Sequence, residues 1–225
     1  MSSVWTIAHV TWLRLIRGRA LWVAFLIAFV PIAYASAMTG RRGGIAIVGL
    51  ELFTFITLIV AVLAPMFVAS SIGEDIEDRT ATYLWSRPVP RWAVFAGKLV
   101  ALVPITAALG LVSWNLAAYI AWGIVPAAYT SVAVLAAVAS VSVVSAGIAS
   151  LAPKHGMALS IVYMLFVDLP LGVRPATLRE ISLSYQARVL AALEEGYAST
   201  AAIALVTVCV VWALIAAWRV RRLEV

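Results

Sequence analysis

Residues 45–71 read IAIVGLELFTFITLIVAVLAPMFVASS, and this apolar run holds a single ionisable side chain, that of Glu51. A helix needs about 20 mostly apolar residues to cross the ~30 Å hydrocarbon layer of a bilayer, so this run is long enough to span one. Five similar runs occupy residues 20–38, 92–120, 130–152, 157–171 and 199–218. The sequence therefore predicts an all-α fold, a polytopic transmembrane bundle of about six spans that forms one domain over residues 1–225.

The composition agrees with this expectation and narrows the class of protein. Hydrophobic residues make up 64% of the chain and charged residues 12%, against roughly 45–50% and about 25% in soluble domains. The net charge of +6 would suggest nucleic acid in a soluble protein. Here the basic residues cluster at the ends of apolar runs, where they orient helices and meet anionic lipid head groups, so no nucleic-acid partner is expected. The single Cys209 excludes a disulfide framework and a cysteine-based metal site.

The distribution of Lys and Arg predicts the orientation, because cytoplasmic loops carry an excess of both. With the N-terminus inside, the inner segments hold eleven of the sixteen basic residues. We therefore expect both ends in the cytoplasm, with the chain in a bacterial inner membrane. An alternative reading treats the first run as a secretory signal, since arginines precede it and Ala35, Ser36 and Ala37 resemble a cleavage site. Cleavage would leave five spans and move the basic segment 79–98 to the unfavoured side.

Two amphipathic helices are expected outside the spans. Residues 3–18 place Trp5, Ala8, Trp12, Leu15 and Ile16 on one stripe, which is typical of an interfacial helix lying in the membrane surface. Residues 177–195 form the second, with Thr177 and Glu180 as a capping box and Gly196 as a stop. Its apolar stripe lies opposite Arg179, Gln186 and Arg188, so we expect this helix on the outer face.

The segment 71–91 between the second and third runs is polar and carries the strongest functional signal. Ser71 with Glu74 is a further capping box, and Pro88 should end the helix at the residue before it. A short, charged helix is thus expected between two spans on the cytoplasmic side. Such a helix suits a docking surface for a soluble partner.

The same segment resembles the permeases of the type-2 ATP-binding-cassette family. The step Glu77-Asp78-Arg79-Thr80, then Pro88, Val89 and Arg91, then Gly97-Lys98, is similar to the family pattern of Glu-x-Gly-Thr, Pro-Val-Ser-Arg and Gly-Lys. Arg79 stands where the family usually has Gly, and Pro90 where it usually has Ser. The six spans, the N-terminal surface helix and the outer segment before the last span extend the resemblance over the chain.

The resemblance implies that residues 71–91 hold the coupling helix, seated in a groove of a separate ATP-binding-cassette ATPase. On that reading the side chains that face the ATPase are Glu74, Asp75, Glu77, Asp78 and Arg79. It also implies an exporter built from two such permeases, a homodimer or a pair with a similar chain. The chain has no Gly-x-x-x-x-Gly-Lys-Ser/Thr phosphate loop, so no cofactor is expected in it, and ATP and magnesium would bind the partner ATPase.

Three polar residues lie inside apolar runs: Glu51, Asn115 and Asp168. Intramembrane carboxylates are costly and often line a pathway, which is one hypothesis. The other is local pairing near the outer surface, of Glu51 with Arg41 or Arg42 and of Asp168 with Arg174. Two rival functions also stay open: a non-transporting scaffold or signalling subunit that docks an ATPase, and an intramembrane enzyme built around Glu51 and Asp168.

Overall fold

The computed structural model describes residues 3–38, 45–77, 91–173 and 177–222. Helices make up most of the described part of the chain, which contains no strand. The longer helices are α1 (Ser3–Arg17), α2 (Ala20–Met38), α3 (Ile45–Ala64), α6 (Arg91–Trp122), α7 (Ala128–Leu151) and α11 (Ala198–Arg222). The shorter ones are α4 (Ser70–Glu77), α8 (Gly156–Val162), α9 (Leu169–Val173) and α10 (Leu183–Leu190). Two π-helical segments (Pro65–Ala69 and Tyr163–Asp168) and two 3₁₀ turns (Pro153–His155 and Thr177–Ile181) complete the described part.

Six helical stretches of the described residues are long and apolar enough to cross a membrane. They are Ala20–Ala37, Val48–Gly73, Trp92–Trp122, Ala128–Leu151, Pro153–Val173 and Ala198–Arg219. The predicted all-α bundle of about six spans is therefore confirmed, and the chain is a multi-pass membrane protein. The fifth span, short in the sequence, gains length because the 3₁₀ turn Pro153–His155 and a π-helical segment extend α8 and α9 into one continuous stretch.

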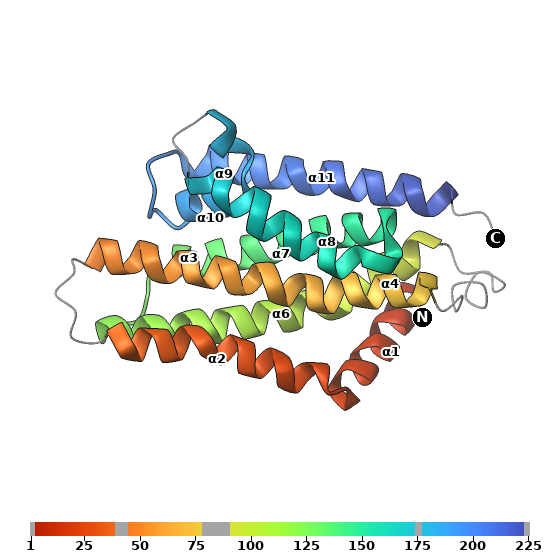
Figure 1. Ribbon diagram of the computed structural model, residues 1–225, viewed down its shortest axis with the longest axis horizontal. Coiled ribbons are helices and arrows are strands. Elements are labelled where there is room, and N and C mark those ends of the chain that lie inside the picture. Colours follow the sequence, from red (N-terminus) through yellow and green to blue (C-terminus); the bar gives the residue numbers. More distant parts are fainter. Residues whose placement is uncertain (1–2, 39–44, 78–90, 174–176, 223–225) are drawn as a thin grey trace.

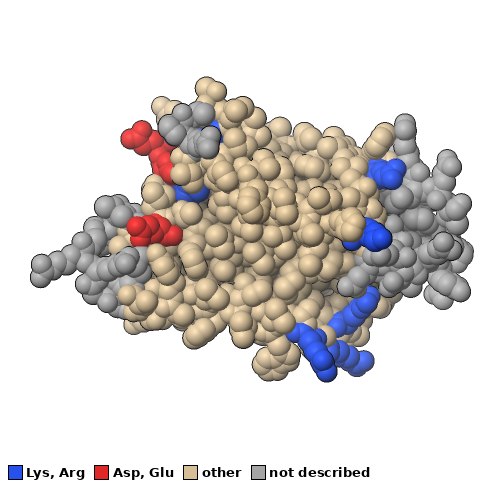
Figure 2. Space-filling view, in the orientation of Figure 1, with Lys and Arg blue, Asp and Glu red and all other residues tan. Residues whose placement is uncertain are grey.

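The bundle has two distinct ends, named here the α1 end and the α10 end (Figure 1). The α1 end holds α1, α4 and the last turn of α11, and the α10 end holds α9, α10 and the first turn of α3. On the face shown in Figure 2, Lys and Arg side chains gather mainly at the α1 end, and Asp and Glu side chains lie at the α10 end. Among the described residues, Arg14, Arg17 and Lys154 are exposed at the first end, and Glu51 and Glu195 at the second.

Helix α7 lies at the centre of the bundle and packs against α3, α6, α8, α10 and α11. Small residues allow these close approaches, as they do in other membrane bundles. A Cβ atom added to Gly147 would come within 2.5 Å of Cε3 of Trp212 on α11, and one added to Gly156 within 2.7 Å of Cα of Ala149. Four of the five serines of α7 are buried: Ser140, Ser142, Ser145 and Ser150. Much of this span is therefore buried in the bundle.

The first span is joined to the rest of the bundle by polar and aromatic contacts. The hydroxyl of Ser113 on α6 donates a 2.7 Å hydrogen bond to the carbonyl of Ala28 on α2. The ring of Tyr34 stacks on that of Phe55 on α3, with centroids 4.7 Å apart. These contacts join α2 to both α6 and α3. Before it, α1 turns away from the axis of α2 (Figure 1) and packs along α6, at the position predicted for the interfacial helix.

Candidate functional site

The helix of the second span continues without a break into the segment that carries the predicted docking residues. Ser70 has right-handed helical angles (φ −61°, ψ −49°), and its N–H bonds to the carbonyls of Phe67 and Pro65. The helix therefore runs unbroken from α3 through Pro65–Ala69 into α4. The expected helix start with a capping box at Ser71 is wrong, because the buried Ile72 continues the apolar packing past that residue.

Helix α4 ends at Glu77, and its last turn contains Glu74, Asp75 and Glu77 at the α1 end. The helical backbone expected for these three positions is present. Asp78 and Arg79, the other two predicted docking residues, lie in residues 78–90, outside the described residues. The predicted stop before Pro88 lies outside them too.

The beginning of α4 is held from two sides. Lys98 of α6 is only 4% exposed, and its ammonium group donates a hydrogen bond to the backbone carbonyl of Ser71. On another side α4 packs against the Pro153–His155 turn, where a Cβ atom on Gly73 would come within 2.6 Å of the carbonyl oxygen of Pro153. A glycine at position 73 thus lets α4 lie directly against that turn.

The residue beside Lys98 makes a similar close approach to α1. A Cβ atom on Gly97 would come within 2.9 Å of the carbonyl oxygen of Val4 and 3.0 Å of Cβ of Ile7. One turn of α6 therefore seats α1 through Gly97 and binds α4 through Lys98. We call Ser71, Gly73, Gly97, Lys98 and Pro153 the α4 clamp. In the sequence, Gly97-Lys98 is recognisable only as part of a family pattern. The close packing of both residues gives the pair a structural role in this chain.

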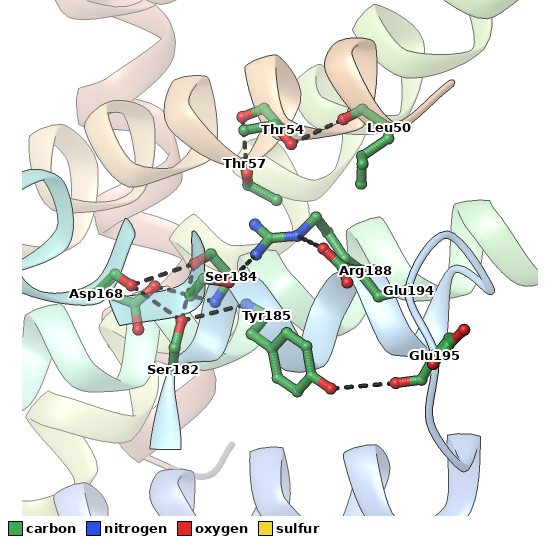
Figure 3. Close-up of polar contacts among 11 residues, drawn as sticks. Leu50, Thr54, Thr57, Asp168, Ser182, Ser184, Tyr185, Arg188, Glu194 and Glu195 are labelled. Atoms are coloured by element: carbon green, nitrogen blue, oxygen red, sulfur yellow. Dashed lines mark hydrogen bonds and ion pairs between the residues drawn. The ribbon is translucent and has the colours of Figure 1, made fainter. Parts of the chain in front are cut away.

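Asp168, at the α10 end, is 3% exposed and holds the first turn of α10 (Figure 3). Its two carboxylate oxygens accept hydrogen bonds from the backbone N–H groups of Leu183 (2.7 Å) and Ser184 (3.0 Å). Its backbone carbonyl accepts a 3.0 Å bond from the hydroxyl of Ser182. Because the first N–H groups of a helix lack partners within it, the carboxylate of the fifth span satisfies two of those of α10.

Arg188 of α10 is the most deeply buried cation of the described chain, at 1% exposure. Its Nη2 donates a 2.6 Å hydrogen bond to the carbonyl of Gly172, and its Nε lies 3.4 Å from a carboxylate oxygen of the half-buried Glu194. Burial lowers the pKa of this guanidinium group, and the charge of Glu194 opposes that shift. Its Nη1 has no hydrogen-bond partner among the described residues. We call Asp168, Gly172, Ser182, Ser184, Arg188 and Glu194 the polar knot.

Gly172 lets the fifth span and α10 meet inside the polar knot. A Cβ atom at this position would come within 2.7 Å of Oγ of Ser182 and 2.8 Å of Oγ of Ser184. Both hydroxyls belong to the hydrogen bonds that fix α10 to Asp168. A larger residue at position 172 would push Ser182 and Ser184 away from the fifth span.

Residues 177–195 differ from the single surface helix expected there. Thr177–Ile181 forms a 3₁₀ turn, and α10 begins only after Ser182, whose hydroxyl accepts a 3.2 Å bond from the N–H of Tyr185. The helix ends at Leu190, and Ala192 has a positive φ of 53°. The expected cap at Thr177 and stop at Gly196 are therefore wrong. The expectation that the polar face of this helix is exposed is also wrong. Residues 183–189, which include Gln186 and Arg188, are buried against the bundle.

The three predicted pathway residues are not brought together. Glu51 is exposed on the first turns of α3, and Asn115 donates a 2.8 Å hydrogen bond to the carbonyl of Leu111 in its own helix. Within the described ranges no hydrogen bond or ion pair joins any two of Glu51, Asn115 and Asp168. Their expected arginine partners, Arg41, Arg42 and Arg174, lie outside these ranges.

Sequence reasoning missed the serines of the polar knot, although a signal was present. Asp168 is an isolated carboxylate in an apolar run, and a buried carboxylate needs hydrogen-bond donors. The only hydroxyl pair shortly after it is Ser182 and Ser184, which together with the backbone supply those donors. A search for donors near each buried acid would have pointed to this pair.

Among the residues that the structure describes, no group of three or more His, Cys, Asp or Glu side chains is placed to hold a metal ion. In the part of the chain that the structure describes, the α4 clamp lies at one end of the bundle and the polar knot at the other. Compared with models of known protein families and with curated proteins, the chain finds no match. The likeness to type-2 permeases rests on the residues quoted above.

Proposed function

We propose that this chain is the membrane-spanning permease subunit of an ATP-driven exporter of the ATP-binding-cassette class. A separate ATPase subunit would bind and hydrolyse ATP, and this chain would couple that hydrolysis to movement of a substrate across the membrane. The observation that carries the proposal is the unbroken helix from the second span into the acidic turn of α4, held by the α4 clamp.

The clamp offers a mechanical connection from a partner to the spans. A force applied to the segment after Glu77 would act on α4, which is the direct continuation of the second span. Through Lys98 and Gly97 the same force would reach α6 and α1. Packed helices move as stiff bodies, so closure of two docked ATPases would tilt several spans together. The acidic turn and the family pattern of residues 77–98 favour a docking role for this end.

The charge distribution supports an orientation with the α1 end in the cytoplasm. The described basic side chains at or near this end include Arg14, Arg17, Arg19, Lys98, Lys154 and Arg219, and cytoplasmic segments are rich in Lys and Arg. In this orientation the polar knot closes the outer side, where α10 is wedged between α7, α9 and α11. We propose that release of substrate requires α10 to shift. Six spans are half of the usual number for such a transporter, so a homodimer or a pair with a similar permease is proposed.

The intramembrane-enzyme alternative gains no support from the geometry. It needs Glu51 and Asp168 to act on one substrate, whereas Asp168 is occupied by two backbone N–H groups and Glu51 is exposed on a different helix. The scaffold alternative differs from the transporter in one respect only, because a scaffold would bind the ATPase without moving a substrate.

The decisive experiment is co-purification of this chain with a co-expressed ATP-binding-cassette ATPase from the same organism. A stable complex with ATPase activity is expected. Charge reversal of the acidic segment, Glu77→Lys with Asp78→Lys, should abolish the complex. The matched control reverses two exposed acids at the opposite end, Glu180→Lys with Glu195→Lys, and should leave the complex intact. If the first double variant still binds the ATPase as tightly as wild type, the proposed docking surface is wrong. A complex that hydrolyses ATP without vesicle transport would favour the scaffold.

A further inference from the structure

The second span passes through a π-helical turn, Pro65–Ala69, immediately before α4. In an α-helix each N–H bonds the carbonyl four residues back. The N–H of Ser70 instead bonds the carbonyl of Pro65, five residues back, together with that of Phe67. The turn therefore holds one residue more than an α-helical turn. Such turns are rare in proteins, and they frequently occur at functional sites.

Two residues at the edges of the turn favour this wide geometry. Pro65 has no N–H to donate to the carbonyl of Ala61, and its ring crowds that carbonyl. At the other edge, the hydroxyl of Ser70 donates a hydrogen bond to the carbonyl of Met66. In a regular α-helix that carbonyl would accept from the N–H of Ser70 itself. The side chain of Ser70 thus occupies the acceptor that an α-helical turn would use.

The contacts of α4 depend on the extra residue. If the turn became α-helical, every residue after it would advance by one helical position, which is about 100° of rotation and about 1.5 Å along the axis. Ile72 would then take the place of Gly73, where a Cβ atom would come within 2.6 Å of the carbonyl oxygen of Pro153. Ser71 would take the place of the buried Ile72, and its carbonyl would leave the ammonium group of Lys98. The α4 clamp therefore accepts only the π-helical register.

We propose that the Pro65–Ala69 turn is a register switch for α4. In one state, the state of this structure, the turn is π-helical and the α4 clamp is closed. In the other state the turn is α-helical, the clamp is open and Ile72 has left its buried site. The helix stays continuous in both states, so the switch changes the face that α4 presents while α4 remains attached to the second span. The proposal rests on the fold and not on the proposed transport function.

The test measures how fast a water-soluble maleimide modifies Ile72→Cys protein in detergent, with the native Cys209 replaced by serine. Ile72 is 5% exposed, so modification reports the open state. Ser70→Ala removes one hydrogen bond of the closed state and should speed modification roughly 2- to 12-fold, since such a bond contributes about 0.5–1.5 kcal/mol. The matched control is Ser140→Ala, which removes the same kind of bond, to the carbonyl of Ala136, from the regular helix α7. This control should leave the rate unchanged.

A one-residue deletion separates a change of register from fraying of α4. Met66 is the half-buried residue of the turn, and the other four residues are buried. Its deletion removes the extra residue, so the helices on both sides keep their registers and the α4 clamp stays closed. In this background Ser70→Ala should no longer speed modification, because no extra residue remains for an α-helical turn to absorb.

Three results would overturn the proposal. A modification rate in Ser70→Ala equal to that in Ser140→Ala would mean that the hydroxyl of Ser70 does not hold the turn. The same acceleration by Ser70→Ala with and without Met66 would mean that α4 frays and does not change register. Loss of folded protein on deletion of Met66, judged by the size-exclusion profile, would mean that the turn is not a one-residue insertion.

Discussion

Replacement of Asp168 by asparagine should release the first turn of α10 while leaving the six spans in place. The carboxylate accepts two backbone N–H bonds, from Leu183 and Ser184. An amide keeps one acceptor oxygen, and its NH₂ group would face the other N–H. One hydrogen bond to a charged acceptor contributes about 1.5–3 kcal/mol, and the donor left without a partner is buried. We therefore expect the free energy of opening of α10 to fall by about 2–3 kcal/mol.

The assay is hydrogen–deuterium exchange in detergent micelles, followed on peptides that cover residues 183–190. A loss of 2–3 kcal/mol corresponds to exchange that is roughly 30- to 150-fold faster in α10. Exchange in α7 should change little. The control is Glu51→Gln, the same chemical change on an exposed side chain, which should leave α10 protected. If Asp168→Asn exchanges within about threefold of wild type, the two hydrogen bonds do not hold α10 and the reasoning fails. A transport defect would indicate a pathway role for Asp168 only if α10 stays protected in Asp168→Asn. If α10 opens, the defect follows from the opening.

Three further substitutions test the packing. Gly147→Ala places a Cβ atom 2.5 Å from the Trp212 ring. This variant should lower the free energy of unfolding by about 1–3 kcal/mol. Adding Trp212→Leu should restore part of that stability in a thermal unfolding assay. Lys98→Met removes a buried donor to the carbonyl of Ser71 and should increase protease cleavage near α4, whereas the exposed Lys154→Met should not. Glu194→Gln weakens the ion pair with the buried Arg188. Because Glu194 is partly exposed, the free energy of unfolding measured by chemical denaturation should fall by about 1–2 kcal/mol. A fall below about 0.5 kcal/mol would contradict the pairing.

Composition and run length predict the spans well, because lipid imposes a length on any apolar helix regardless of its neighbours. The first span illustrates this, since residues 20–38 match α2 at both ends. Residues 177–195 illustrate the opposite case. Their local pattern favours a cap at Thr177, but α10 begins after Ser182 because Asp168, 14 residues earlier, accepts hydrogen bonds from the first turn. No local pattern contains that information.

Only part of the α4 clamp could be predicted from the sequence. Gly97-Lys98 was singled out by a pattern, but the contacts of the pair with Val4 and Ser71 depend on how three helices come together. The start assigned to Ser71 failed for a different reason. Serine caps a helix start only when its own backbone is non-helical, and here Ser71 lies inside a continuous helix.

The burial of α10 has a consequence for how the chain is assembled during its synthesis. Eight residues that include a buried arginine and glutamine are too short and too polar to enter lipid as a separate insertion unit. The helix can reach its place only after the ribosome has released the fifth span and the last one, which form two of its walls. A nascent chain that stops before residue 198 and carries a cysteine introduced into α10 should therefore react with water-soluble cysteine reagents at that position. Completion of α11 would be the step that closes this end of the protein.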